Sequence, residues 1–210
     1  DQLPGYRGMG PVRRGNQAAE HVQHDVYGQV VLGVAQSFFD TRLMKRPGLT
    51  EFEQLEPVGE RAFAVHDTPD AGIWEFRTIA HVHTSSAIMC WAACDRLAKI
   101  AAHLGLPARA DYWRERAEIV HGTILEKAWN EEIGAFTAAF GGEDLDASVL
   151  LMAEIGFMAA DDPRYVSTVQ VINRDLREGD HVYRYKVTDD FGKPKTAFTA
   201  CTFWLVDALY

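Results

Sequence analysis

The chain has 210 residues, of which 47% are hydrophobic and 24% are charged. These are ordinary values for a folded protein, and they exclude a disordered chain. The formal net charge of −9 argues against nucleic acid and against an anionic membrane surface as partners. No apolar run reaches the length that a membrane-spanning helix needs, and no signal-peptide pattern opens the chain. The chain begins without a methionine and ends in an apolar stretch without a helix stop. We therefore expect that both ends were cut from a longer protein.

The three cysteines, Cys90, Cys94 and Cys201, are too few and too scattered for a disulfide framework. We therefore expect reduced thiols in the core of a cytoplasmic protein. Cys90 and Cys94 share one helix face, but no second cysteine or histidine pair accompanies them at the spacing of a zinc site. His81 and His83 lie in an expected loop without an obvious carboxylate partner. The sequence therefore predicts neither a metal site nor a cofactor.

Apolar residues recur at helical spacing in two patterns that alternate along the chain. In the first pattern nearly every side of the helix is apolar, so the helix should be buried all round. This pattern predicts helices over residues 22–39, 84–103, 145–158 and 197–210. In the second pattern a single apolar stripe lies opposite a charged face, which is typical of an outer helix. This pattern predicts helices over residues 49–59, 108–127 and 163–178.

The fully buried helices begin about every 60 residues, and each except the last is followed by a one-sided helix. Such pairing is what an α/α toroid requires, with an inner ring of helices and an outer ring that faces water. We therefore predict an all-α fold, a partial toroid with about four inner and three outer helices. No linker divides residues 1–210, so a single domain is expected. Short β segments should occur only in the connections, at 134–137 and 183–185.

The connections of such a toroid predict where the site lies. Consecutive helices run antiparallel, so every connection from an outer to an inner helix emerges at the same end. These connections are residues 60–83, 128–144 and 179–196, and the segment 4–20 before the first inner helix joins them. They are also the richest in Gly, Trp, Asp and Glu. Loops on one face of a rigid scaffold often carry function, so we expect the site at this end, the site face.

One stretch of the site face carries a candidate catalytic group. Within the run from Asp70 to Arg77, the carboxylate of Glu75 follows Trp74 and lies two residues before Arg77. A glutamate covered by an aromatic ring is a plausible general acid, because apolar cover raises the pKa of a carboxyl group toward the working pH. The alternative is a loop that leads into a helix, in which the tryptophan packs and the Glu–Arg pair is solvated.

Several segments together resemble the C-terminal part of the catalytic domain of glycoside hydrolase family 15, the glucoamylase, glucodextranase and bacterial trehalase group. They occur in order along essentially the whole chain, and the ordered set is specific although each motif alone is weak. They are Gly5 to Gly8, Pro11 to Asn16, Asp25 to Gly28, Asp70 to Arg77, Met89 to Trp91, Leu145 to Ser148, Val182 to Tyr185 and Phe198 to Val206.

The resemblance implies an (α/α)6 barrel and inverting hydrolysis of α-glucosidic bonds, either at non-reducing ends or in trehalose. In such a reaction one carboxylic acid protonates the leaving oxygen while a second carboxylate activates water, the two standing about 6.5–9.5 Å apart. The Gly-Ile-Trp-Glu match gives the general-acid role to Glu75. Trp74, Arg77, Arg13 and Tyr6 are candidates for binding an oligosaccharide or disaccharide substrate. For each of these four residues, packing or a structural salt bridge is the alternative.

The chain departs from the family pattern at the second carboxylate. That group lies three residues before the Phe of the Phe-x-x-Cys-Ser/Thr-Phe-Trp segment, and here this position is Lys195. A protonated lysine, with an ordinary pKa of about 10.4, cannot act as a general base. Asp189 or Asp190 could replace it only if their loop were aimed differently. A catalytically impaired, carbohydrate-binding relative is therefore the alternative function, and a non-enzymatic helical scaffold is a third hypothesis.

A second departure is an absence. The family segments Asn-Trp-Asp-Tyr-Arg and Leu-Arg-Asp, which build the pocket for the terminal sugar, do not occur in this sequence. Four inner helices where the family has six would leave an open seam, and soluble monomers avoid such large apolar patches. We therefore expect a fragment, or a half barrel that the missing N-terminal part or another chain completes.

Overall fold

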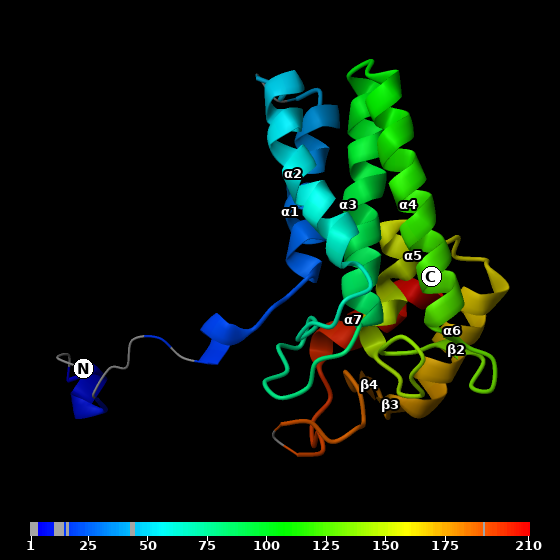
Figure 1. Ribbon diagram of the computed structural model, residues 1–210. Helices are drawn as coiled ribbons and strands as arrows, with labels where there is room; N and C mark the ends of the chain where they lie inside the picture. The colour runs from blue at the N-terminus through cyan, green and yellow to red at the C-terminus, as the bar shows by residue number, and fades with distance from the viewer. Residues whose placement is uncertain (1–3, 11–14, 16, 43–44, 191) are drawn as a thin grey trace.

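The computed structural model describes residues 4–10, 15, 17–42, 45–190 and 192–210. Its helices are long in the first part of the chain and shorter toward the end (Figure 1). The α-helices are α1 (Asp25–Phe39), α2 (Leu49–Val65), α3 (Thr84–His103), α4 (Pro107–Lys127), α5 (Met152–Ile155), α6 (Pro163–Asp175) and α7 (Thr199–Leu209). Among the described residues, no helix combines the length and apolar character that a membrane crossing requires.

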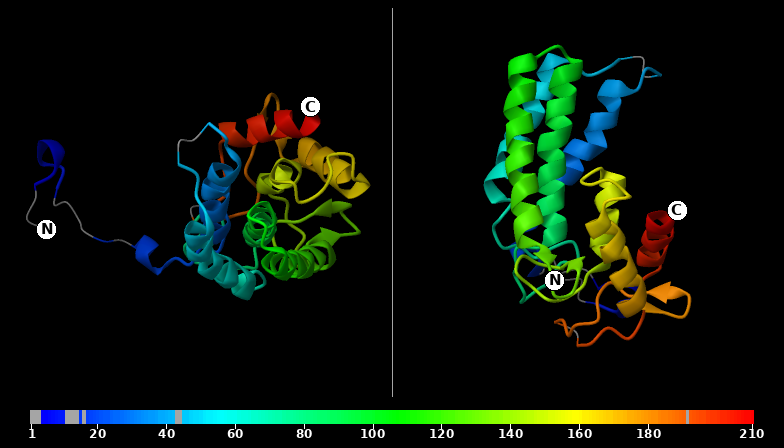
Figure 2. Two further views of the ribbon diagram at one scale, coloured as in Figure 1. Left: turned by 90° about the horizontal axis from the view of Figure 1, so that it is seen from above. Right: turned by 90° about the vertical axis from the view of Figure 1, so that its right-hand side faces the viewer.

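The helices follow one another around an arc, as the left view of Figure 2 shows. Helices α3 and α5 lie on the inside of this arc, and α2, α4 and α6 lie on the outside. The predicted alternation of inner and outer helices is confirmed, and α3 has the predicted bounds. Helix α3 is the most extensively buried element, because helices pack against it from both sides of the arc.

Helix α2 runs to Val65, so the predicted end at Gly59 is wrong. Gly59 is buried where α2 crosses α3 and α4, and a Cβ atom there would overlap the side chains of Leu97 and Trp113. A glycine in a helix costs about 1 kcal/mol relative to alanine, but here it permits close packing around a fully buried indole. The packing therefore outweighs the stop signal that the sequence suggested.

The predicted inner helix over residues 145–158 is also wrong in its bounds. Its first part is a 3-10 helix, η3 (Ala147–Leu151), and only α5 is α-helical. The start is delayed because the side chain of Asp146 accepts a hydrogen bond from the Ser148 amide. The end comes early because Gly156 adopts a left-handed conformation with φ +83°, a common helix stop.

The short strands pair as hairpins in the connections. Strand β1 (Trp129–Asn130) pairs with β2 (Ala135–Phe136), and β3 (Arg177–Glu178) pairs with β4 (His181–Val182). The predicted segment 134–137 contains β2 and is confirmed, whereas 183–185 follows β4 and is not a strand.

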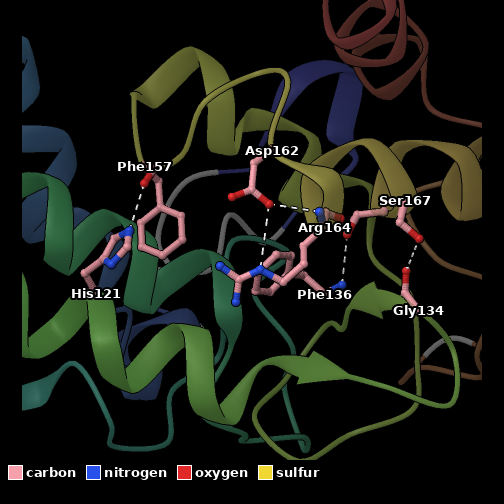
Figure 3. Close-up of polar contacts among 8 residues, drawn as sticks. His121, Gly134, Phe136, Phe157, Asp162, Arg164 and Ser167 are labelled. Atoms are coloured by element: carbon pink, nitrogen blue, oxygen red, sulfur yellow. Dashed lines mark hydrogen bonds and ion pairs between the residues drawn. The ribbon is translucent and has the colours of Figure 1, made fainter.

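Contacts around α6 hold this part of the arc together (Figure 3). Asp162 caps the helix by accepting a hydrogen bond from the Arg164 amide at 2.9 Å. One turn later, the Ser167 hydroxyl donates to the carbonyl of Gly134 at 2.6 Å and thereby fixes the β1–β2 hairpin to the helix. The His121 ring on α4 contacts the carbonyl of Phe157 at 3.0 Å, which connects the end of α5 to the outer helix.

Helices α1 and α7, at the two ends of the arc, are not buried all round. Val26, Val30 and Val34 form an exposed row along α1, and Phe203, Val206 and Leu209 are exposed on α7. The prediction of complete burial is wrong for these two helices. Among the described residues, they have neighbours on one side of the arc only.

Candidate functional site

The three connections from outer to inner helices emerge at one end of the structure, the lower end in Figure 1. They are residues 66–83, 128–146 and 176–198, and hydrogen bonds join them to one another. Phe140 donates its amide proton to the carbonyl of Val82 at 3.0 Å, and Ala147 donates to the carbonyl of Arg184 at 2.8 Å. The three predicted connections therefore form one connected surface, whereas the predicted fourth member, segment 4–20, runs away from the helices in the part that the structure describes (Figure 1).

Glu75 lies in the first connection, within the segment Asp70–Thr78 that we call the Glu75 loop. Its backbone is left-handed, with φ +56°, a conformation that costs free energy for any residue other than glycine. Two backbone hydrogen bonds hold it, from the Glu75 amide to the carbonyl of Gly72 at 3.1 Å and from Phe76 to Ala71 at 3.0 Å. The Glu75 side chain is exposed. A strained backbone persists only where the surrounding structure holds it in place. Such residues are found most often at functional sites.

Trp74 anchors the Glu75 loop from one side. Its indole Nε1 donates a hydrogen bond to Oδ2 of Asp146 at 2.7 Å, although the two residues are far apart in sequence. Around the indole lie the rings of Tyr185, Phe198 and Trp204, with centroids 6.3, 5.8 and 6.1 Å away. Asp146 is buried, and burial raises the pKa of its carboxyl group. Trp74 therefore joins the first connection to the second and the third.

Asp190 anchors the Glu75 loop from the other side. Its carboxylate accepts hydrogen bonds from the amides of Arg77 at 2.6 Å and Thr78 at 3.0 Å, and a further one from the Thr78 hydroxyl. These bonds, led by that from the Thr78 hydroxyl, lower the pKa of Asp190. Both carboxylate oxygens are thus occupied by the loop, so Asp190 is ionised but poorly placed to accept a proton from water.

The floor beneath the Glu75 loop is a buried polar cluster. Oδ2 of Asp70 accepts hydrogen bonds from the His24 amide and from the Ser86 hydroxyl, each at 2.8 Å. The His83 ring packs against Gly72 on one side and stacks on Phe76 with a centroid distance of 5.6 Å. Burial lowers the pKa of both His24 and His83, which favours neutral rings. The floor therefore fixes the first half of the loop.

A cavity of about 440 Å³ opens between the three connections, within the usual size range of ligand pockets. Its walls combine aromatic side chains (Phe76, Phe140 and Tyr185) with polar ones (His81, Asp144 and Thr188). Phe76, the residue after Glu75, belongs to this wall, whereas Glu75 does not. Aromatic faces with a few polar groups at the edges suit a small molecule that has apolar faces and hydroxyl groups.

The structure brings three of the predicted site residues together and separates the others. Trp74, Glu75 and Arg77 share one loop, whereas Lys195 is exposed and lines a different, shallow pocket of about 370 Å³ with Glu178 and His181. Tyr6 is 75% exposed in the segment that runs away from the helices (Figure 1). Arg13 lies outside the described residues. The substrate-binding roles of these residues, and the base position of Lys195, stay predictions.

Two residues of the site were missed by the sequence analysis. Asp146 was noted only as part of the Leu145–Ser148 segment, and Asp190 only as a possible replacement for the base. No local pattern indicates that Asp146 meets Trp74, because that contact depends on the arrangement of whole helices. The buried state of Asp146 is the signal that identifies it once the fold is known.

The described residues contain no group of three or more His, Cys, Asp or Glu side chains that could hold a metal ion. Cys90, Cys94 and Cys201 are buried free thiols. Burial raises the pKa of all three thiols, to about 12 for Cys94 and Cys201, so they remain protonated and unreactive.

Comparison with known proteins gives consistent results. The trehalase of Mycobacterium tuberculosis is 40% identical over 214 residues, and that of Thermoplasma volcanium is 30% identical over 209 residues. The alignments cover 99% and 98% of this chain but 30% and 33% of the relatives, so the chain spans about a third of their length.

Solved structures share the fold. A wild-type glycosidase superposes with a TM-score of 0.76 at 18% identity, covering 98% of this chain and 55% of the other. The glucoamylase of Saccharomycopsis fibuligera gives a TM-score of 0.68 at 12% identity, covering 89% and 47%. The predicted partial (α/α)6 toroid is confirmed by these likenesses. The model of the family "Glycosyl hydrolases family 15" matches residues 2–210. The chain therefore belongs to glycosyl hydrolase family 15.

Proposed function

We propose that the protein hydrolyses α-glucosidic bonds with inversion, in trehalose or at the non-reducing ends of α-glucans, with Glu75 as the general acid. One observation carries this proposal: Glu75 holds a left-handed backbone in a loop that is anchored on both sides. A solvated helix-entry loop has no need of a strained residue with two such anchors. Membership of the family, and relatives named as trehalases, support the reaction class.

The proposed chemistry divides between the site residues. Glu75 donates its proton to the oxygen of the leaving sugar as the glycosidic bond breaks, while a carboxylate on the opposite side takes a proton from the attacking water. Trp74 and Arg77, which flank Glu75 in the same loop, are the proposed contacts for the sugar. Arg13 and Tyr6 complete the proposed binding set.

Lys195 favours a second candidate function. A protonated lysine at the position expected for the general base has no lone pair to accept a proton, so it cannot activate water. The second candidate is therefore a relative with impaired catalysis that still binds carbohydrate. Asp190 does not remove this difficulty, because its oxygens already accept hydrogen bonds from the Glu75 loop.

We further propose that residues 1–210 are the C-terminal part of a single catalytic domain. The exposed apolar rows on α1 and α7 support this, since such faces are normally covered. The segment that covers these rows would be the N-terminal part of the same barrel or another chain that completes it. The buried, protonated thiols agree with the cytoplasmic location that the cysteine count predicts.

The test measures turnover of trehalose, maltose and isomaltose by the full-length protein, its Glu75→Gln variant and its Glu143→Gln variant. Glu143 is an exposed glutamate of the second connection and serves as the matched control. We expect Glu75→Gln to lower kcat by about 10²–10⁴-fold, the usual contribution of a general acid, and Glu143→Gln to have no effect. If the wild type turns over a substrate and Glu75→Gln does so equally fast, Glu75 is not the general acid. If neither protein turns over or binds any of the sugars, the non-enzymatic scaffold is the correct reading.

A further inference from the structure

The carboxylate of Asp146 is shared between two connections of the site face. Its Oδ1 accepts a hydrogen bond from the Ser148 amide at 2.7 Å, and its Oδ2 accepts one from the Trp74 indole at 2.7 Å. The residue is only 5% exposed, so water cannot replace either donor. The guanidinium of Arg184, 5.2 Å from the centroid of the Trp74 ring, is the cation near this carboxylate.

The two donors are of different kinds. The Ser148 bond caps η3, in the same way that Asp162 caps α6 by accepting from the Arg164 amide. The Trp74 bond has no counterpart at Asp162, and it fixes the side chain directly before the strained residue Glu75. Asp146 therefore does more than cap the start of η3, because it also binds the indole of Trp74.

We propose that Asp146 is a positioning residue, which holds the Trp74 indole and through it keeps Glu75 in the left-handed conformation. A carboxylate suits this task because it offers two acceptor oxygens and no competing N–H donor. An asparagine in its place could accept only one of the two bonds, and its NH₂ group would face the other donor. The catalytic part of this inference rests on the proposed role of Glu75, whereas the structural part does not.

Two variants break the same bond from opposite ends. Asp146→Asn removes one acceptor, and Trp74→Phe removes the indole donor while it keeps an aromatic ring and the cap on η3. Asp162→Asn is the matched control, because it weakens a helix cap with the same hydrogen-bond pattern elsewhere in the arc (Figure 3). If the bond acts as one unit, the double variant should be no worse than the more impaired of the two single variants.

The first readout needs no activity. Hydrogen exchange of peptides that cover residues 70–80 in the full-length protein should be at least about tenfold faster in Asp146→Asn and Trp74→Phe than in the wild type, because the amides of Glu75 and Phe76 lose their support. Asp162→Asn should leave these peptides unchanged. Unchanged exchange in Asp146→Asn would overturn the proposal, whatever the turnover.

The second readout is the rate. We expect kcat to fall by about 10–100-fold in both variants. In Asp146→Asn, KM should stay within about twofold, because a misplaced acid affects the transition state more than binding. If Glu75→Gln abolishes turnover while Asp146→Asn changes only exchange and not kcat, Asp146 is structural and the proposal is wrong. If Glu75→Gln has no effect, the proposed function fails, and exchange alone decides the role of Asp146.

Discussion

The two sides of the proposed reaction rest on very different parts of the site face. The Glu75 loop is held by a buried carboxylate at Trp74, by Asp190 at the other end and by a polar floor below. The segment around Lys195 is exposed and borders a shallow pocket, and it is tied at its end by the Phe198 amide to the carbonyl of Val182. The loop of the proposed acid is thus held on several sides, whereas the segment at the proposed base position has neither a carboxylate nor comparable support.

The strongest test of this contrast places a carboxylate at the position proposed for the general base. Lys195→Glu in the full-length protein should raise kcat for trehalose or maltose by about 100-fold, because a general base contributes about 10²–10⁴-fold. Lys193→Glu, an exposed lysine two residues away, is the control for the added negative charge. Steady-state kinetics with both substrates measures the effect. A fast wild type that gains nothing from Lys195→Glu would mean that the base lies elsewhere.

The packing of the Glu75 loop on the buried His83 ring can be tested by adding one methyl group at Gly72. Gly72 has φ +65°, and a Cβ atom there would lie 2.7 Å from Cδ2 of the buried His83 ring. We expect Gly72→Ala to lower the free energy of unfolding by about 1–3 kcal/mol, the usual cost of a strained backbone position. Gly122→Ala is the matched control, since this α4 glycine has open space around it.

The control variant Gly122→Ala should instead raise the free energy of unfolding by up to about 1 kcal/mol, because alanine is the better helix former. Urea titration of both variants measures the difference. Equal stability of the two alanine variants would show that His83 and the loop can shift to accept a Cβ atom at Gly72 without a loss of stability.

The anchor at Asp190 is expected to matter less, because it is partly exposed. Asp190→Asn keeps the size of the side chain but weakens the bonds to the amides of Arg77 and Thr78, each worth about 1.5–3 kcal/mol at most when the acceptor is charged. We expect kcat to fall by less than about tenfold, a smaller effect than in Asp146→Asn. Asp180→Asn, an exposed aspartate of the same connection, serves as the control.

The smallest expected effect is on the pH dependence of stability. Burial lowers the pKa of His83 below its ordinary value of 6.5, so the unfolded chain binds more protons than the folded one just below that pH. Stability is therefore retained above pH 6.5 and lost as the pH falls toward the lowered value. We expect the melting temperature to drop from pH 7.5 to pH 5.5, and to drop less in His83→Phe, as measured by calorimetry. An identical drop in both proteins would assign the effect to other groups, such as His24.

Much of the fold can be predicted from the sequence, because helical periodicity is a local property. Helix α3 is apolar on several faces and ends before Gly105, so its bounds follow from the residues alone. At Gly59 the same reasoning fails, since the packing against Leu97 and Trp113 decides whether the helix continues. The contact between Trp74 and Asp146 could not be predicted, because it depends on distant segments meeting. The left-handed backbone of Glu75 could not be predicted either, because residues other than glycine rarely adopt it.

The apolar rows on α1 and α7 have a practical consequence for anyone who produces this polypeptide. A chain of only these residues would display valine and phenylalanine side chains at both edges of its arc. Such edges adhere to one another, so recombinant material limited to this stretch should accumulate in inclusion bodies or as large oligomers. If the proposed N-terminal part of the barrel covers these edges, a longer expressed chain should stay in solution where milder buffers fail.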